Sequence, residues 1–206
     1  MGKISKKEVK KVNKEKINKK DKVYKILTWI LNAFMMIGTI FILIYFIKEK
    51  DYSRVYTGAL IYLVIFLPCL LEKTKYKFNA KYKFIYSVFV LLGDFLGSIV
   101  NLYKYLWWFD LFVHFLSGVL TVVGAYYILE RSKYKNISGF IEFIYVIGFV
   151  TLIGMSWEII EYTMDVVFKL NLQHSIETGV ADTMEDMIIA LVGGIIGYLC
   201  YKKKKH

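Results

Sequence analysis

The stretch Trp108–Leu129, WFDLFVHFLSGVLTVVGAYYIL, decides the fold class of this chain. It is almost wholly apolar, and about 20 such residues are enough for a helix to cross a bilayer. Two polar side chains, Asp110 and His114, interrupt it near its start. A charged side chain in the middle of a membrane helix costs roughly 2.5–3.5 kcal/mol on insertion scales, so such residues indicate a functional site.

Five other segments are apolar and long enough to cross. With the first stretch, the predicted spans are residues 24–47, 55–71, 83–101, 108–129, 138–161 and 182–201. The composition agrees, because 57% of the residues are hydrophobic and a soluble domain has about 45–50% apolar residues. We expect an all-α, polytopic membrane helical bundle with six transmembrane helices. The membrane domain covers residues 24–201, between a basic tail at 1–23 and a basic C-terminus at 202–206.

The basic residues predict the orientation of the spans. Of the 28 Lys and Arg residues, 23 lie in the two terminal segments and the second and fourth loops, and 5 lie in the other three loops. By the positive-inside rule, both termini are cytoplasmic, and the protein is expected to be a multi-pass protein of the cell membrane. This pattern accounts for the net charge of +11, so we expect no nucleic-acid partner. Cys69 and Cys200 fall near cytoplasmic span ends and are expected to be free thiols.

Acidic residues gather at the opposite side. Eight of the 17 lie within or at the ends of the predicted spans: Asp94, Asp110, Glu158, Glu161, Asp165, Asp182, Glu185 and Asp186. In the predicted topology, four different helices bring all eight to the non-cytoplasmic half. Their convergence predicts a polar site that opens to the outer face.

The spacing of these residues adds detail. Asp110 and His114 are four residues apart and share a helix face, and Asp182 and Asp186 have the same spacing. The last predicted span has only 15 apolar residues after its acids, or about 22 Å of helix, which is less than a hydrocarbon core of about 30 Å. The acids at its start are therefore expected at membrane depth.

A divalent metal ion is the simplest compensation for so many carboxylates, because they cannot all stay ionised without a cation or bound protons. Oxygen ligands suit Mg²⁺, Ca²⁺ or Mn²⁺, and an imidazole extends the choice to Zn²⁺ or Fe²⁺. We predict His114 and Glu161 as catalytic residues, either of which serves as general base. The predicted metal ligands are Asp110, Glu158, Asp182 and Asp186.

Structural interpretations of the same acids remain open. Asp182 and Glu185 have the spacing of a capping box, and Asp110 is also placed to cap a helix. Asp94 lies between two glycines and could be a buried hydrogen-bonding strut as readily as a ligand. The Gly193-x-x-x-Gly197 pair predicts close helix packing, and the aromatic residues at span ends predict an interfacial belt.

Three motifs carry a family resemblance: Trp108–Phe115, Trp157–Tyr162 and Asp182–Met187, followed by Ala190 and Gly193. In this order they resemble the YjdF-like family of uncharacterised bacterial inner-membrane proteins. The resemblance implies an architecture and no reaction, because the activity of that family is not established. The Asp-x-x-x-His pattern is also similar to VanZ-like membrane proteins, which are associated with glycopeptide resistance, but this chain differs by its Glu-x-x-Glu pair.

The function expected from these features is metal-dependent hydrolysis or group transfer on a lipid or lipid-linked substrate, with membrane lipids as partners. Two alternatives remain open. One is an ion- or proton-coupled carrier that uses the same acids, and the other is a non-enzymatic membrane scaffold. The carrier is disfavoured because the acids gather at one face and leave the cytoplasmic half of the spans apolar.

Overall fold

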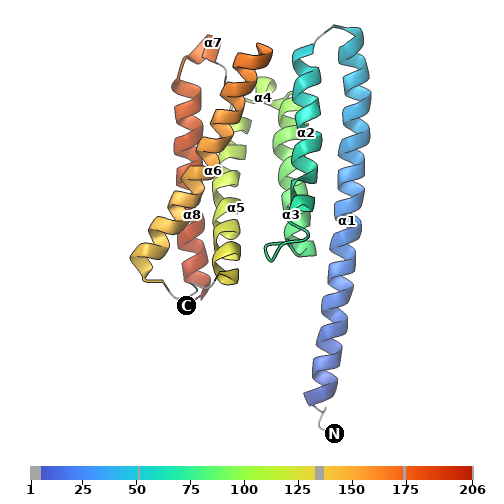
Figure 1. Ribbon diagram of the computed structural model, residues 1–206, viewed down its shortest axis with the longest axis vertical. Helices are drawn as coiled ribbons and strands as arrows, with labels where there is room; N and C mark the ends of the chain where they lie inside the picture. The colour runs from blue at the N-terminus through green and yellow to red at the C-terminus, as the bar shows by residue number, and fades with distance from the viewer. Residues whose placement is uncertain (1–5, 51, 133–136, 174, 206) are drawn as a thin grey trace.

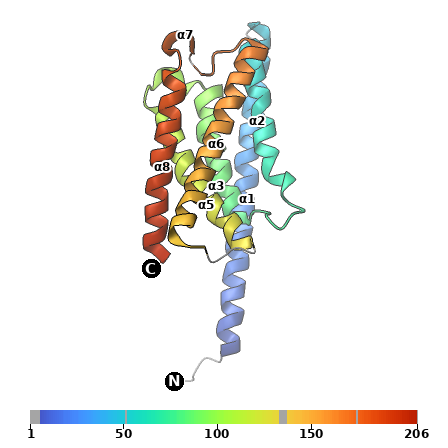
Figure 2. The same cartoon turned by 60° about the vertical axis from the view of Figure 1, so that its left-hand side comes forward.

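The computed structural model describes residues 6–50, 52–132, 137–173 and 175–205, and this part of the chain is helical with no β-strand. The first five residues of the predicted basic tail lie outside the described residues. The helices form two three-helix halves that stand side by side (Figures 1 and 2). The predicted all-α fold class is confirmed.

The first half contains α1 (Lys6–Lys48), α2 (Tyr52–Leu70) and α3 (Ala80–Val90). The α3 helix begins where Asn79 accepts a hydrogen bond from the Tyr82 backbone N–H at 3.1 Å, and it continues as a π-helical segment, η1 (Leu91–Ile99). These helices enclose one apolar core, formed by Met35, Ile65, Val90, Phe95 and Ile99.

The second half contains α5 (Phe109–Arg131), α6 (Gly139–Phe168) and α8 (Ala181–Lys205), with the short helices α4 (Leu102–Tyr105) and α7 (Ser175–Thr178) in the connections. It has a separate apolar core, formed by Val122, Ala125, Tyr126, Leu129, Val146, Val150 and Tyr198. Each half therefore buries its own apolar side chains.

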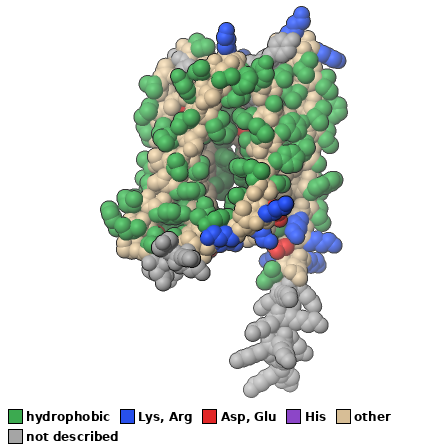
Figure 3. All heavy atoms as spheres, viewed as in Figure 1, with side chains coloured by type: hydrophobic (Ala, Val, Ile, Leu, Met, Phe, Trp, Pro, Cys, Tyr) green, Lys and Arg blue, Asp and Glu red, His purple; other side chains and the backbone are tan. Residues whose placement is uncertain are grey.

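Five helices are long and apolar enough to cross a membrane: Ile17–Lys48, Ala80–Ile99, Phe109–Arg131, Gly139–Phe168 and Ala181–Lys204. The predicted span at 55–71 falls in α2, whose described apolar part is Gly58–Leu70 and is shorter. The structure therefore supports five of the six predicted spans. Large apolar side chains cover much of the face of the bundle that Figure 3 shows. Trp29, Leu63 and Phe140, for example, are 73%, 71% and 72% exposed. An exposed apolar surface of this extent suits contact with lipid.

Both termini lie at one end of the bundle, which we call the terminus end, and α4 and α7 lie at the opposite end, which we call the α4–α7 end (Figure 1). The predicted boundaries at 23/24 and 201/202 fall inside α1 and α8, because both helices continue into the basic segments. Lysine is a good helix former, so a basic run does not end a helix. The α6 helix also extends beyond residue 161, to Phe168.

A tyrosine repairs the hydrogen-bond gap that a proline leaves in α2. Pro68 has no N–H, so it cannot bond the carbonyl of Val64 one turn earlier. The Tyr86 hydroxyl of α3 donates to that carbonyl at 2.7 Å. This bond gives the Val64 carbonyl a donor and couples α2 to α3.

We expect Tyr86→Phe to lower the free energy of unfolding by about 1 kcal/mol, because the Val64 carbonyl loses its donor. In a Pro68→Ala background the new N–H at position 68 can bond the same carbonyl, and the cost of Tyr86→Phe is expected to shrink. Unfolding of the four proteins in detergent measures this cycle. An equal cost in both backgrounds would contradict the hydrogen-bond account.

Candidate functional site

Three potential metal-ligand atoms meet at the α4–α7 end of the second half. Asp110 and His114 come from the first two turns of α5, and Asp186 comes from the second turn of α8. His114 Nε2 lies 3.5 Å from Asp110 Oδ1 and 3.7 Å from Asp186 Oδ2. The ligand atoms of the three residues all lie within 4.8 Å of one another. His114 and Asp186 are buried, at 8% and 3% exposure.

These separations fit a shared cation better than direct hydrogen bonds. An N–H···O hydrogen bond spans about 2.7–3.2 Å, which is shorter than both distances from His114 Nε2. Two ligand atoms bound to one ion at about 2.1 Å, in tetrahedral geometry, lie about 3.4 Å apart. An imidazole with two carboxylates is a donor set for Zn²⁺, Mn²⁺ or Fe²⁺.

Close contact between α5 and α8 brings the three residues together. A Cβ atom on Gly118 would lie 2.0 Å from the Ala190 carbonyl oxygen, and one on Gly193 would lie 2.1 Å from the Phe115 carbonyl oxygen. Only glycine permits this backbone approach at either position. Gly197 also faces α5, at Val119, so the predicted packing role of the Gly193-x-x-x-Gly197 pair is confirmed.

Glu158 of α6 is a buried carboxylate beside this cluster. It is 5% exposed, and its Oε2 atom has no hydrogen-bond partner among the described residues. Its charge lies within electrostatic range of Asp110 and Asp182. No Lys or Arg in the described part of the chain is within ion-pair distance of Glu158. A buried carboxylate oxygen without a partner is costly, and a bound cation or proton would satisfy it.

The structure places the other two predicted site residues around the cluster rather than in it. Glu161 is half-buried, and its Oε1 atom accepts a hydrogen bond from Trp157 Nε1 at 2.8 Å. Asp182 lies one turn before Asp186 and within electrostatic range of it. The group of three therefore contains two of the four predicted ligands, together with the histidine predicted as a base.

The helix starts bear on the capping interpretation of Asp110 and Asp182. The α5 helix has Trp108 as its N-cap, and α8 begins at Ala181. Asp110 and Asp182 therefore lie inside the first turns, where a carboxylate interacts favourably with the helix dipole although it is not the N-cap residue. Glu185 is exposed and points away from the buried face of α8.

Two further acids have structural positions outside the cluster. Asp165 accepts hydrogen bonds from the backbone N–H groups of Leu172 and Gln173, at 2.7 and 3.1 Å, and so closes the loop after α6. Asp94 lies in η1 of the first half, half-buried. The eight acids therefore divide among a buried cluster, its surroundings, a loop anchor and the other half of the bundle.

Tyr103 is a neighbour of the site that sequence reasoning missed. Its hydroxyl donates to the Gly93 carbonyl at 2.9 Å and lies within electrostatic range of Asp94, Asp110 and Asp186. The ring lies against Gly97, where a Cβ atom would come within 2.3 Å of it. A tyrosine at a span end is usual in a membrane belt, so nothing in the sequence distinguishes this one.

Comparison with known proteins gives a family and no reaction. The family described as "Predicted membrane protein (DUF2238)" matches residues 30–204 of the chain. An uncharacterised protein of Thermotoga maritima is 27% identical over 143 residues, which cover 68% of this chain and 72% of that protein. No solved structure matches the chain. The resemblance to VanZ-like proteins finds no support in these matches.

Proposed function

Because the chain belongs to the DUF2238 family of predicted membrane proteins, we propose a finer topology for it: six spans, with both termini on the cytoplasmic side of a bacterial cell membrane. Two observations support this topology. Both termini lie at the same end of the bundle, which requires an even number of crossings, and α2 supplies the sixth (Figure 1). The loops and tails at the terminus end carry most of the Lys and Arg residues. The motifs that resemble YjdF-like proteins support the same family assignment.

Single cysteines introduced at the two ends test this topology. In a Cys69→Ser/Cys200→Ser background, we expect a membrane-impermeant maleimide to label Ile176→Cys, at the α4–α7 end, in intact cells. Lys75→Cys, at the terminus end, should react only after the cells are opened. Both positions are exposed in the structure. The opposite pattern would invert the orientation, and labelling of both in intact cells would exclude six spans.

For the site, we propose a divalent metal ion held by Asp110, His114 and Asp186. The spacing of their three ligand atoms, within 4.8 Å of one another, carries this proposal. The two carboxylates and the neutral imidazole together balance a divalent charge. The unpartnered Oε2 atom of Glu158 supports the same proposal, because a bound cation nearby would lower the free-energy cost of burying this carboxylate.

The position of the cluster favours a lipid or lipid-linked substrate. His114 and Asp186 lie five residues inside the starts of α5 and α8, or about 7.5 Å along each helix. This depth corresponds to the headgroup region of a bilayer. Trp107 and Trp108, exposed beside the start of α5, suit the same interfacial level.

The reaction class that suits this arrangement is hydrolysis or group transfer at a phosphoryl or acyl centre. The ion would act as a Lewis acid toward the reacting group. Asp110, His114 and Asp186 would hold it, so His114 is not free to act as the base. Glu158 would then act as the general base in place of His114 and take a proton from the attacking water. Glu161, which accepts a hydrogen bond from Trp157, is a second carboxylate near the site.

An ion-coupled carrier is less well supported. Below the cluster, the interior of the second half is filled by Val122, Val146 and Val150, which are 1%, 0% and 2% exposed. No polar route continues from the cluster through this part of the described core. A carrier needs such a route or a large rearrangement of the helices.

Metal content of the detergent-purified protein tests the proposal directly. We expect near-stoichiometric Zn²⁺, Mn²⁺ or Fe²⁺ by inductively coupled plasma mass spectrometry, lost in His114→Ala and in Asp186→Asn. Glu185→Gln is the matched control, because it removes an exposed acid next to Asp186. Turnover of a lipid substrate that a chelator abolishes would then identify the enzyme. Metal-free protein after soaking in all three ions would exclude the metal site.

A further inference from the structure

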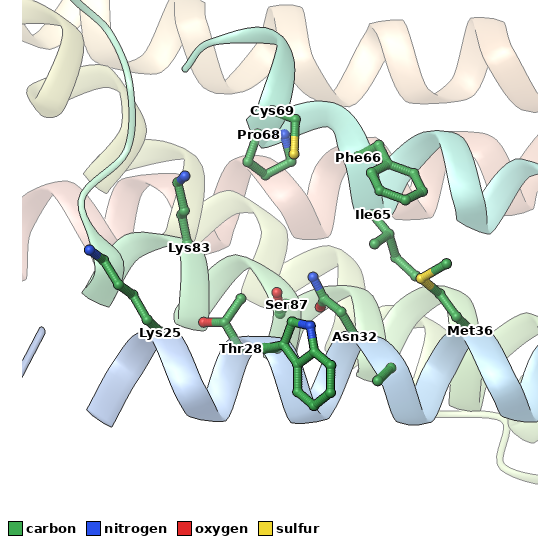
Figure 4. A pocket seen from close by; sticks show the side chains of 12 residues that line it. Lys25, Thr28, Asn32, Met36, Ile65, Phe66, Pro68, Cys69, Lys83 and Ser87 are labelled. Atoms are coloured by element: carbon green, nitrogen blue, oxygen red, sulfur yellow. The ribbon is translucent and has the colours of Figure 1, made fainter. Parts of the chain in front are cut away.

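A second site lies at the terminus end, in the half of the bundle that does not contain the acidic cluster. A pocket of about 400 Å³ opens between α1, α2 and α3 (Figure 4). Lys25 of α1 and Lys83 of α3 lie at one end of it, and Asn32 and Phe66 lie farther along. Trp29 of α1 also lines the pocket. Its volume is in the range of ligand pockets in proteins.

The charges at the mouth are arranged around one carboxylate. The Lys83 ammonium donates a hydrogen bond to Glu72, in the turn after α2. This bond and the charge of Lys83, with smaller contributions from Lys77 and Lys25, hold the pKa of Glu72 below its usual range. The negative charge of Glu72 is therefore stabilised by both Lys25 and Lys83, so an anion in the same place would be attracted by both. Two positive charges face one carboxylate there.

Polar groups continue into the pocket one to two turns beyond the lysines. Asn32 lies seven residues after Lys25, and its Oδ1 atom is buried with no hydrogen-bond partner in the described structure. Ser87, four residues after Lys83, is 4% exposed and also lines the pocket. An amide and a hydroxyl at this depth can bond the glycerol and ester groups of a lipid.

The side of the pocket is apolar and faces the membrane. Trp29 is 73% exposed and Phe66 is 50% exposed, on the surface that lipid would cover. An acyl chain can therefore lie along this side while its headgroup stays at the lysines. A small soluble anion would use only the charged end.

From this arrangement we propose that the pocket binds one anionic phospholipid from the leaflet at the terminus end. Its phosphate lies between Lys25 and Lys83 in competition with Glu72, its glycerol region meets Asn32 and Ser87, and one acyl chain follows Trp29 and Phe66. The site is independent of the metal cluster, which lies at the opposite end of the other half.

Native mass spectrometry of the full chain in detergent tests this site with phosphatidylglycerol, phosphatidylcholine and inorganic phosphate. We expect phosphatidylglycerol to bind tighter than phosphatidylcholine, and Lys25→Gln/Lys83→Gln to weaken its binding at least about tenfold. Lys22→Gln/Lys81→Gln removes two exposed lysines of the same helices that do not line the pocket, and should change binding less than threefold. Glu72→Gln should strengthen binding, because it removes the competing carboxylate.

Three results would overturn the proposal. Equal losses in the two double variants would show a general effect of surface charge. Equal binding of the two lipids would show that the lysines do not select a headgroup. Displacement of phosphatidylglycerol by millimolar inorganic phosphate would show a site for a soluble anion. Circular dichroism and the detergent gel-filtration profile confirm that each variant is folded before it is compared.

Discussion

Gly118→Ala is expected to lower the free energy of unfolding by about 3 kcal/mol, the upper part of the range for overpacked interiors. The added Cβ atom would lie 2.0 Å from the Ala190 carbonyl oxygen and 2.8 Å from the Gly194 backbone nitrogen. Both obstacles are backbone atoms of α8, which cannot rotate away as a side chain can. The helices must therefore separate, which would also move Asp186 away from His114.

Gly124→Ala on the same helix is the matched control. A Cβ atom on Gly124 meets nothing within 4 Å, so this variant should be at least as stable as the wild type, because alanine favours the helix more than glycine does. Thermal unfolding in detergent measures both variants, and metal content shows whether the cluster survives. If Gly118→Ala and Gly124→Ala are equally stable, α5 and α8 do not pack as closely as the structure has them.

The second large effect is a reversal of stability order by metal. In the presence of a chelator, Asp186→Asn is expected to unfold at a higher temperature than the wild type. The reason is that Asp110, Glu158 and Asp182 all lie within electrostatic range of Asp186, and removing its charge relieves their repulsion. After addition of the ion found in the purified protein, the wild type should become the more stable of the two. Binding at a metal concentration 100 times the Kd would stabilise it by about 2.7 kcal/mol.

Glu185→Gln separates this effect from a general change of charge. Glu185 is exposed, so its substitution should leave both the metal-free stability and the metal response close to those of the wild type. Parallel unfolding curves with and without metal for wild type and Asp186→Asn would contradict a metal site that includes Asp186. Higher stability of Asp186→Asn under both conditions would indicate carboxylates compensated by protons alone.

Local spacing predicts which acidic residues share a helix face. It does not predict which of them belong to the group of three potential ligands. The four-residue spacing of Asp110 and His114 puts both on one face of α5, and the structure brings them together as the sequence predicts. Asp182 and Asp186 share a face for the same reason, yet only Asp186 joins the group of three. The depth at which α8 meets α5 selects one acid from the pair, and the glycine contacts set that depth.

Asp165 and Tyr103 show two ways in which the sequence misjudged membership of the site. It suggested Asp165, which lies outside the site, and it did not suggest Tyr103, which lies beside it. In the sequence, Asp165 lies at helical spacing from Glu158 and Glu161. In the structure the loop after α6 folds back, and two of its backbone N–H groups donate hydrogen bonds to the Asp165 carboxylate. Tyr103 has no distinguishing pattern, but the glycines of η1 admit its ring beside the acids. Both outcomes depend on segments that meet only after folding.

The sequence by itself determined the helical membrane class and five candidate spans. The reason is that a run of about 20 apolar residues is a local property, and it is enough for a helix to cross the hydrocarbon core of a bilayer. It also determined which acids share a helix face, since that follows from 3.6 residues per turn. Only the tertiary structure decided that Asp110, His114 and Asp186 meet, that Glu158 keeps an unpartnered oxygen beside them, and that Asp94 belongs to the other half. The physical reason is that contacts between helices depend on how closely their backbones approach, and Gly118 and Gly193 set that approach from positions outside the acidic motifs.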